Sequence, residues 1–206
     1  MTMSPLGIVH IVDDDTLVRE SLADLLRSLN YQVALYPSAA EFLDNRLSEA
    51  PACLVLDVRL PGASGLELQD YLARVDIKLP VILMTGFADV PMSVKGMKAG
   101  AIDFLTKPIR DQDLIDAVAA AIRSDQDHRR QMAEIGELQA RYGLLTPRER
   151  QVVALVASGL MNKQVANELS ISEVTVKMHR GSAMRKLGAK SVARLARMAE
   201  ILHLSR

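Results

Sequence analysis

The side chains of this sequence whose types suit chemistry stand at the ends of short apolar runs. Asp57 ends one run, Asp13 and Asp14 follow another, and Thr85 and Lys107 lie at the ends of two more. If the five lie together, the three carboxylates repel one another unless a cation lies between them. Oxygen ligands with room for water suit Mg²⁺. The set therefore predicts a magnesium site with a hydroxyl and an ammonium group beside it.

Segments of helical periodicity separate these apolar runs along the first half of the chain. A continuous apolar run bounded by turn residues is typical of a parallel strand buried on both faces. Five such strands alternating with helices predict a doubly wound α/β sheet, whose strands bring their carboxyl ends to one edge. The five runs are IVHIV at 8–12, YQVALY at 31–36, CLVL at 53–56, VILMT at 81–85 and AIDFLT at 101–106.

Each of these polar residues also has an ordinary structural interpretation. Asp15 is expected to cap the helix that follows it, because Asp is favoured at that position, and Asp13 or Asp14 taken alone has the same use. Thr85 would be a strand-end residue and Lys107 a solvated surface lysine. The placement of the whole set at consecutive strand ends favours the functional interpretation.

The distribution of charge divides the chain into two parts. The net charge is zero, yet residues 1–124 carry 11 Lys and Arg against 17 Asp and Glu, whereas residues 144–206 carry 11 against 4. With 206 residues, of which 49% are hydrophobic, the chain is long enough to bury two cores. An acidic front part and a basic rear part indicate two domains with different partners, the rear partner being a polyanion.

The cysteine content and the length of the apolar runs indicate where in the cell the protein is located. The single cysteine, Cys53, lies within an apolar run, where a thiol serves as a small core residue, and it allows no disulfide within the chain. No apolar run reaches the roughly 18 residues of a membrane helix, and the first run lacks the flanks of a signal peptide. We therefore expect a cytoplasmic protein with no membrane partner.

Four helices are predicted in the basic rear part of the chain. Thr146, Pro147 and Glu149 form the capping-box pattern at the start of the first helix. A short turn at 170–172 joins the second and third helices, and Gly188 is expected to end the third. Two helices joined by such a turn are typical of an all-α helix-turn-helix domain that binds DNA.

The third of these helices is rich in basic residues. A cationic outer face on this helix suits entry into the major groove, where phosphate contacts supply affinity and a few residues contact bases. The alternative is a solvated basic helix. The basic residues are Lys177, His179, Arg180, Arg185 and Lys186, and Val176, Ala183 and Leu187 share a face that can pack inward.

Residues 124–143 form a polar segment of good helix formers between the two parts. The segment has no proline, and only Gly136 interrupts it. A narrow apolar stripe at helical spacing leaves two interpretations open: a helix packed on its own domain, or a signalling linker that pairs with a second copy. The stripe consists of Met132, Ile135, Leu138 and Tyr142.

The motifs VDDD, LVLDVRLPGASG, MTG and DFLTKP resemble, in that order, those of the receiver domain of two-component response regulators, which has a flavodoxin-like fold. The resemblance covers residues 6–123. It implies that Asp57 accepts a phosphoryl group from a histidine kinase. It also implies that Asp13 and Asp14 hold Mg²⁺ together with Asp57 and the backbone carbonyl of Arg59.

The same resemblance implies how the phosphoryl group is stabilised and sensed. Thr85 would offer a hydroxyl donor and Lys107 a charge to the phosphoryl oxygens. When Thr85 moves toward the phosphoryl group, Phe104 would swing inward, although core packing explains Phe104 as well. The face that changes would span 86–104, with 90–98 as its moving segment.

The motifs LTPRERQVV and NKQVANELSISEVTVKMHR resemble the output domain of FixJ/NarL, or LuxR-type, regulators over residues 144–203, and the whole chain resembles the FixJ subgroup. The last helix is where this family dimerises on DNA, here through Leu195, Met198 and Leu202. Gly181 departs from the larger or charged residue of many relatives, and it either lets the backbone approach DNA or removes a base contact. The resemblance assigns DNA contacts to Thr175, Lys177, Met178, His179 and Arg180 in the third helix and to Asn162 and Lys163 at the start of the second.

These features predict a phosphorylation-activated transcription regulator, and no enzyme beyond self-phosphorylation from small donors and autodephosphorylation. The receiver domain is expected at 6–123, a helical linker at 124–143 and the DNA-binding domain at 144–206. The expected partners are a sensor histidine kinase, double-stranded promoter DNA, RNA polymerase and, once phosphorylated, a second copy of the chain. Activation would act by dimerisation, by release of the output domain from the receiver, or by both.

Two rival functions compete with this one. A phosphatase of the haloacid-dehalogenase pattern also uses an aspartyl nucleophile, but it needs a second Asp two residues later, where this chain has Arg59. A constitutive DNA-binding protein with a vestigial receiver would have no physical need to keep the like charges of Asp13, Asp14 and Asp57 together. Phosphate-independent DNA binding would favour this second rival.

Overall fold

The computed structural model describes residues 5–62, 64–86, 90–202 and 204. Positions 87–89 of the predicted moving face, and positions 203, 205 and 206 of the predicted DNA-binding domain, lie outside the described residues. The chain divides into two compact units, Met1–Arg129 and Arg130–Arg206. Each unit has a hydrophobic core of its own.

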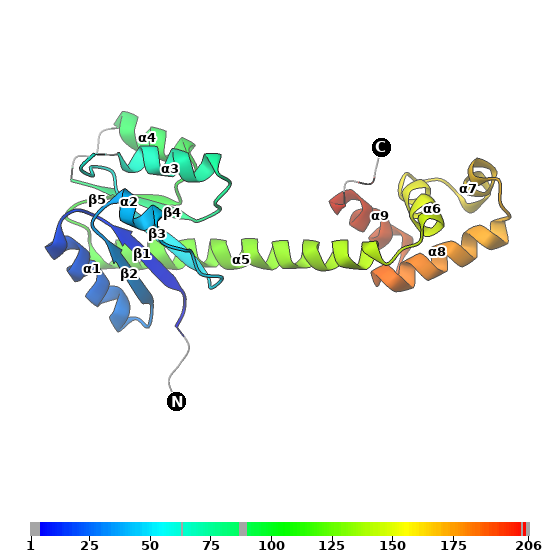
Figure 1. The fold of residues 1–206 in the computed structure, drawn as a ribbon, viewed down its shortest axis with the longest axis horizontal. Coiled ribbons are helices and arrows are strands. Elements are labelled where there is room, and N and C mark those ends of the chain that lie inside the picture. The colour runs from blue at the N-terminus through cyan, green and yellow to red at the C-terminus, as the bar shows by residue number, and fades with distance from the viewer. Residues whose placement is uncertain (1–4, 63, 87–89, 203, 205–206) are drawn as a thin grey trace. The chain divides into compact units, whose positions relative to one another are not determined.

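The first unit is built around a sheet of five parallel strands in the order β2-β1-β3-β4-β5. Helices cover both faces of the sheet (Figure 1). The doubly wound α/β fold predicted from the alternating runs is therefore confirmed. The strands are β1 (Ile8–Val12), β2 (Gln32–Tyr36), β3 (Ala52–Asp57), β4 (Val81–Thr85) and β5 (Asp103–Thr106), and the helices are α1 (Thr16–Ser28), α2 (Ala39–Leu43), α3 (Gly65–Arg74), α4 (Val90–Lys98) and α5 (Asp111–Gly143).

Successive residues of each strand point into two different cores. Val9 and Ile11 pack with Leu26 of α1 and the first turns of α5, whereas Val12 packs on the opposite face with α2 and α3. Strands β1 and β3 are buried along their whole length, which explains their continuous apolar runs. Cys53 is buried among these core residues, as predicted. Each large apolar side chain buried here stabilises the fold by about 1.5–3 kcal/mol.

The second unit is all-helical and contains the end of α5. Thr146 and Glu149 form the predicted capping box at the start of its first complete helix. Ser172 caps the third complete helix, and Gly188, with a φ of 72°, ends it in the left-handed conformation that glycine adopts without strain. The four complete helices, as predicted in number, are α6 (Pro147–Ala157), α7 (Asn162–Leu169), α8 (Glu173–Leu187) and α9 (Val192–Ile201).

The packing of the second unit contradicts one prediction about α9. Leu195 is fully buried with Val153 and Val165, so the prediction that its side chain is exposed to a partner chain is wrong. The physical reason is that α9 packs against α6 through the side that carries this residue. Met198 and Leu202 are only partly buried.

Helix α5 is continuous from Asp111 to Gly143, and Gly136 lies within it without breaking it. In the second unit, Leu138 is buried, and the Arg150 guanidinium lies over the Tyr142 ring at 5.2 Å from its centroid. The carboxyl-terminal half of the apolar stripe, Leu138 and Tyr142, thus packs on the core of the second unit, whereas Met132 is 52% exposed and pairing with a second copy stays a prediction. Within the described part of the chain, no helix is both long enough and apolar enough to cross a bilayer.

Asp125 of α5 holds that helix to the first unit. Its buried carboxylate accepts hydrogen bonds from the backbone N–H of Ala52 at 2.8 Å and from the Arg129 guanidinium at 2.6 Å. Arg129 also donates to the carbonyl of Glu49 at 2.7 Å. The first two turns of the segment predicted as a linker are thus bonded to the start of β3 and to the loop before it.

Candidate functional site

The carboxyl ends of β1 and β3 bring three aspartates together at one edge of the sheet. Asp13, Asp14 and Asp57 each present a carboxylate oxygen, and these oxygens lie within 4.8 Å of one another. Asp13 is fully buried, Asp57 is 5% exposed and Asp14 is exposed. Because Asp13 and Asp57 are buried and Asp14 is exposed, the cluster is open to solvent on one side. Its all-oxygen donor set fits a hydrated Mg²⁺ ion.

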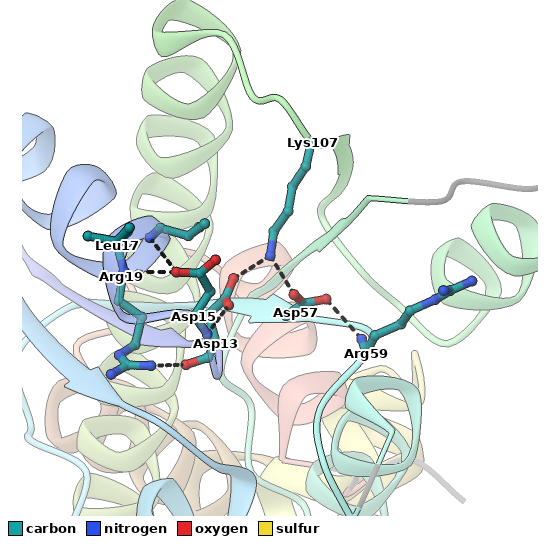
Figure 2. Close-up of polar contacts among 8 residues, drawn as sticks. Asp13, Asp15, Leu17, Arg19, Asp57, Arg59 and Lys107 are labelled. Atoms are coloured by element: carbon teal, nitrogen blue, oxygen red, sulfur yellow. Dashed lines mark hydrogen bonds and ion pairs between the residues drawn. The ribbon is translucent and has the colours of Figure 1, made fainter.

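Lys107, which follows β5, bridges the two buried aspartates (Figure 2). Its ammonium donates to the Asp13 and Asp57 carboxylates, with both Nζ–Oδ2 distances at 2.5 Å. Burial alone would lower the pKa of Lys107, but the hydrogen bonds to both carboxylates raise it overall. Burial raises the pKa of Asp13, and the hydrogen bond from Lys107 acts in the opposite direction. The ammonium therefore supplies a permanent positive charge beside Asp57.

The remaining oxygens of the aspartates are held by the backbone. Asp57 Oδ1 accepts from the N–H of Arg59 at 2.8 Å, and Asp13 Oδ1 accepts from the N–H of Asp15 at 2.9 Å (Figure 2). The Arg19 guanidinium donates to the backbone carbonyl of Asp13 at 2.5 Å. The two bonds from backbone N–H groups orient the carboxylates, which is the positioning that an in-line phosphoryl transfer requires.

Asp15 is a helix cap, as predicted. Its Oδ1 accepts from the backbone N–H of Leu17 at 2.8 Å and of Val18 at 3.3 Å, at the start of α1. Of the three consecutive aspartates after β1, only Asp13 and Asp14 take part in the acidic cluster.

Thr85 and Phe104 lie on the neighbouring strands β4 and β5. Thr85 is fully buried at the end of β4, and its carbonyl accepts from the N–H of Lys107 at 2.8 Å. The bond between Lys107 and Pro108 is cis. Phe104 is partly buried and packs against the core on the α3 side of the sheet, so core packing accounts for its position here. Its predicted switching role stays a prediction.

Gly65, at the first position of α3, is a site residue that the sequence reasoning did not identify. A Cβ atom there would lie 2.2 Å from the backbone oxygen of Asp57 and 3.0 Å from the Val58 Cα. Both neighbours are backbone atoms, so neither can rotate away. The only signal in the sequence was the glycine itself in the motif LPGASG, because glycine is the residue used where backbones approach closely.

We expect Gly65→Ala to destabilise the first unit by about 1–3 kcal/mol, because the added methyl overpacks the backbone of Asp57. Urea unfolding followed by circular dichroism measures the loss. Gly86→Ala is the matched control, since a Cβ there meets no atom within 4 Å. Equal midpoints for the two variants would contradict the close approach.

In the second unit, α8 presents one continuous exposed stripe to solvent. We call it the outward face: Val174, Lys177, Met178, Gly181 and Arg185, at helical spacing and all exposed. The opposite side of the helix carries the buried residues Val176, Ala183 and Leu187, as predicted. Lys177 and Met178, both predicted DNA contacts, therefore point away from the core, and Lys163 is exposed at the start of α7.

Three other predicted DNA contacts are bonded to neighbouring side chains. Thr175 shares a hydrogen bond of 2.8 Å with the Ser172 hydroxyl, and the Arg180 guanidinium donates to Asn162 Oδ1 at 3.0 Å. His179 is partly buried. The bond from Arg180 to Asn162 joins the middle of α8 to the start of α7, so it holds the helix-turn-helix pair together.

Lys186 was grouped with the basic outer residues of α8, but its ammonium turns toward α6. It donates to Glu149 Oε2 at 2.7 Å and to the carbonyl of Leu144 at 3.2 Å, while Ser182 donates to Glu149 Oε1 at 2.6 Å. The hydrogen bond from Lys186, followed by that from Ser182, lowers the pKa of Glu149 to about 2. The buried Glu149 carboxylate thus binds α8 to the start of α6.

Comparisons with known proteins agree with both units. The sequence profile described as "Response regulator receiver domain" matches residues 9–119, and the one described as "Bacterial regulatory proteins, luxR family" matches residues 143–199. Receiver domains generally bind Mg²⁺ at an acidic cluster of this kind and imply a histidine kinase partner, and a LuxR-type domain implies DNA binding.

Relatives match along nearly the whole chain. Nodulation protein W of Bradyrhizobium diazoefficiens is 49% identical over 199 residues, which cover 97% of this chain and 88% of that protein. The transcriptional regulatory protein FixJ of Azorhizobium caulinodans is 45% identical over 191 residues, 93% of this chain and 90% of that one. The solved response regulator StyR has a TM-score of 0.81 at 44% identity, over 96% of this chain and 99% of that one. The chain therefore belongs to the FixJ group of two-component response regulators, signalling proteins that combine a receiver domain with a LuxR-type DNA-binding domain.

Proposed function

We propose that phosphorylation of Asp57 activates this protein as a transcription regulator, with Mg²⁺ held by Asp13, Asp14, Asp57 and the backbone carbonyl of Arg59. The observation that carries the proposal is the bridge from Lys107 to both buried carboxylates, because it places one ammonium in contact with Asp57 and with a second carboxylate of the acidic cluster. In the transfer, an Asp57 oxygen forms a P–O bond as the P–N bond of the kinase phosphohistidine breaks. Bound Mg²⁺ would neutralise charge on the equatorial oxygens.

The side chains around Asp57 have different roles in the phosphoryl transfer. Lys107, held protonated by its carboxylate partners, donates to a phosphoryl oxygen, and Thr85 offers its hydroxyl. Movement of Thr85 toward the phosphoryl group, followed by Phe104, would then shift α4. The close packing of α4 at Gly96 supports a coupling between Phe104 and α4. A Cβ at Gly96 would lie 2.4 Å from Leu83 and 3.7 Å from Phe104, so α4 lies close to the strand that carries Phe104.

We assign residues 6–123 to the receiver, 124–143 to the connecting helix and 144–206 to the DNA-binding domain. Phosphorylation would favour a homodimer that binds two half-sites of promoter DNA and works with RNA polymerase in the cytoplasm. Sedimentation of the full chain with and without Mg²⁺ and an acyl phosphate tests the switch. A shift from monomer to dimer supports it, while a phosphorylated monomer with increased DNA binding would indicate release of the output domain instead.

We expect Lys177→Ala to weaken binding to promoter DNA about tenfold, because this exposed ammonium is the central cation of the outward face. Binding is measured on a duplex enriched from a random-sequence pool, at several salt concentrations. If Lys177 contacts a phosphate, the salt slope also falls by about one. Lys78→Ala, in the first unit and paired with Asp76, is the control. Unchanged affinity for Lys177→Ala would remove α8 as the DNA-contacting helix.

A further inference from the structure

The outward face of α8 carries two apolar side chains that the cationic pattern does not explain. Val174 is 76% exposed and Met178 is 62% exposed, and their spacing of four residues places them one turn apart on the same side. Val174 was not among the predicted DNA contacts. Neither side chain serves the core, because the buried residues of α8 lie on its opposite side.

Two polar side chains of α8 that flank the outward face are already hydrogen-bonded within the unit. Thr175 is bonded to Ser172, and Arg180 is bonded to Asn162. In the amino-terminal half of the outward face, Lys177 is the cation, and it lies beside the two apolar side chains. A helix that enters the major groove by its amino-terminal turns contacts bases with those residues. Here that contacting surface includes the exposed side chains of Val174 and Met178.

Gly181 lies on the same face, one turn beyond Lys177 and Met178. A Cβ at this position would meet no atom within 4 Å, so packing within the unit does not require a glycine. The absence of a side chain removes the group that would otherwise hold the helix backbone away from a surface. A short side chain such as Val174 can then reach the floor of the groove.

Resting on the proposed DNA-binding function, we propose that Val174 and Met178 recognise thymine through its 5-methyl group. In the major groove the thymine methyl is the apolar group that distinguishes A·T pairs, and it makes apolar contacts with side chains of this kind. The operator therefore contains thymines at the positions that face Val174 and Met178, with Lys177 supplying a polar contact beside them.

The experiment removes single methyl groups from the DNA. The full chain, treated with Mg²⁺ and an acyl phosphate, enriches a duplex from a random-sequence pool, and each thymine of that duplex is then replaced in turn by deoxyuridine. We expect affinity to fall about fourfold at one or two thymines in each half-site, the loss that corresponds to one buried methyl group. At all other thymines the replacement leaves affinity unchanged.

Protein variants assign each methyl to its side chain. In Val174→Ser the fourfold effect disappears at one thymine, and in Met178→Gln it disappears at the other. Val75→Ser, at an exposed valine of the first unit, keeps the full pattern. Tight binding with no effect of deoxyuridine at any position would overturn this inference and leave DNA binding intact. Failure to enrich any sequence would overturn both together.

Discussion

Replacing Asp57 by Asn is expected to abolish the phosphoryl adduct that the native chain forms with Mg²⁺ and an acyl phosphate. The amide oxygen can still accept from the N–H of Arg59, which lies 2.8 Å from Asp57 Oδ1, so the loop after β3 keeps its hydrogen bond. The amide nitrogen, however, is no nucleophile, and it faces the Lys107 ammonium. Intact mass spectrometry measures the adduct directly.

Asp15→Asn is the matched control for Asp57→Asn. It removes a carboxylate close to the same strand ends, but Asn caps helices as well as Asp does, so α1 and the phosphorylation of Asp57 should both persist. Hydroxylamine-labile phosphate on the Asp57→Asn protein would show that another residue, Asp13 or Asp14, is the acceptor. In that case the bridge from Lys107 would have to be explained as structural.

Replacing Glu149 by Ala should destabilise the second unit by about 1–2 kcal/mol, because the hydrogen bonds of the buried carboxylate are lost while the partly exposed Lys186 ammonium can turn to solvent. The change deletes the hydrogen bonds from Lys186 and Ser182 and half of the capping box with Thr146. Hydrogen–deuterium exchange of α6 and α8 in the full chain measures the local loss. The control is Glu168→Ala, at an exposed position of α7, in which α6 and α8 should exchange as slowly as in the native chain.

The contribution of Glu149 also depends on pH, with a definite sign. Its pKa is about 2 in the folded chain against 4.5 for the free side chain, so the unfolded chain binds more protons between these values. The stabilisation is fully present above pH 4.5 and is lost as the pH falls toward 2. The difference in protection between the native chain and Glu149→Gln should therefore shrink across this window. A constant difference would mean that the charge of Glu149 contributes nothing.

Local patterns were enough to predict most of the receiver site. Asp13, Asp57, Thr85 and Lys107 each follow an apolar run, and in a parallel sheet the carboxyl ends of all strands lie on one edge, so no long-range information was needed to group them. The helix caps at Asp15, Thr146 and Ser172 were equally predictable, because a cap bonds to backbone groups only two or three residues away.

The sequence by itself thus determined the fold class, the strand-end cluster and the helix boundaries, whereas the tertiary structure decided which side chains bond to one another. Lys107 meets Asp13 across 94 residues, and Lys186 meets Glu149 across 37. The first pair depends on the order of the strands in the sheet, and the second on how α8 rotates as it packs against α6. The rotation of α9 buries Leu195, which the sequence pattern had placed outside. Periodicity identifies the apolar side of a helix, but only packing decides what that side contacts.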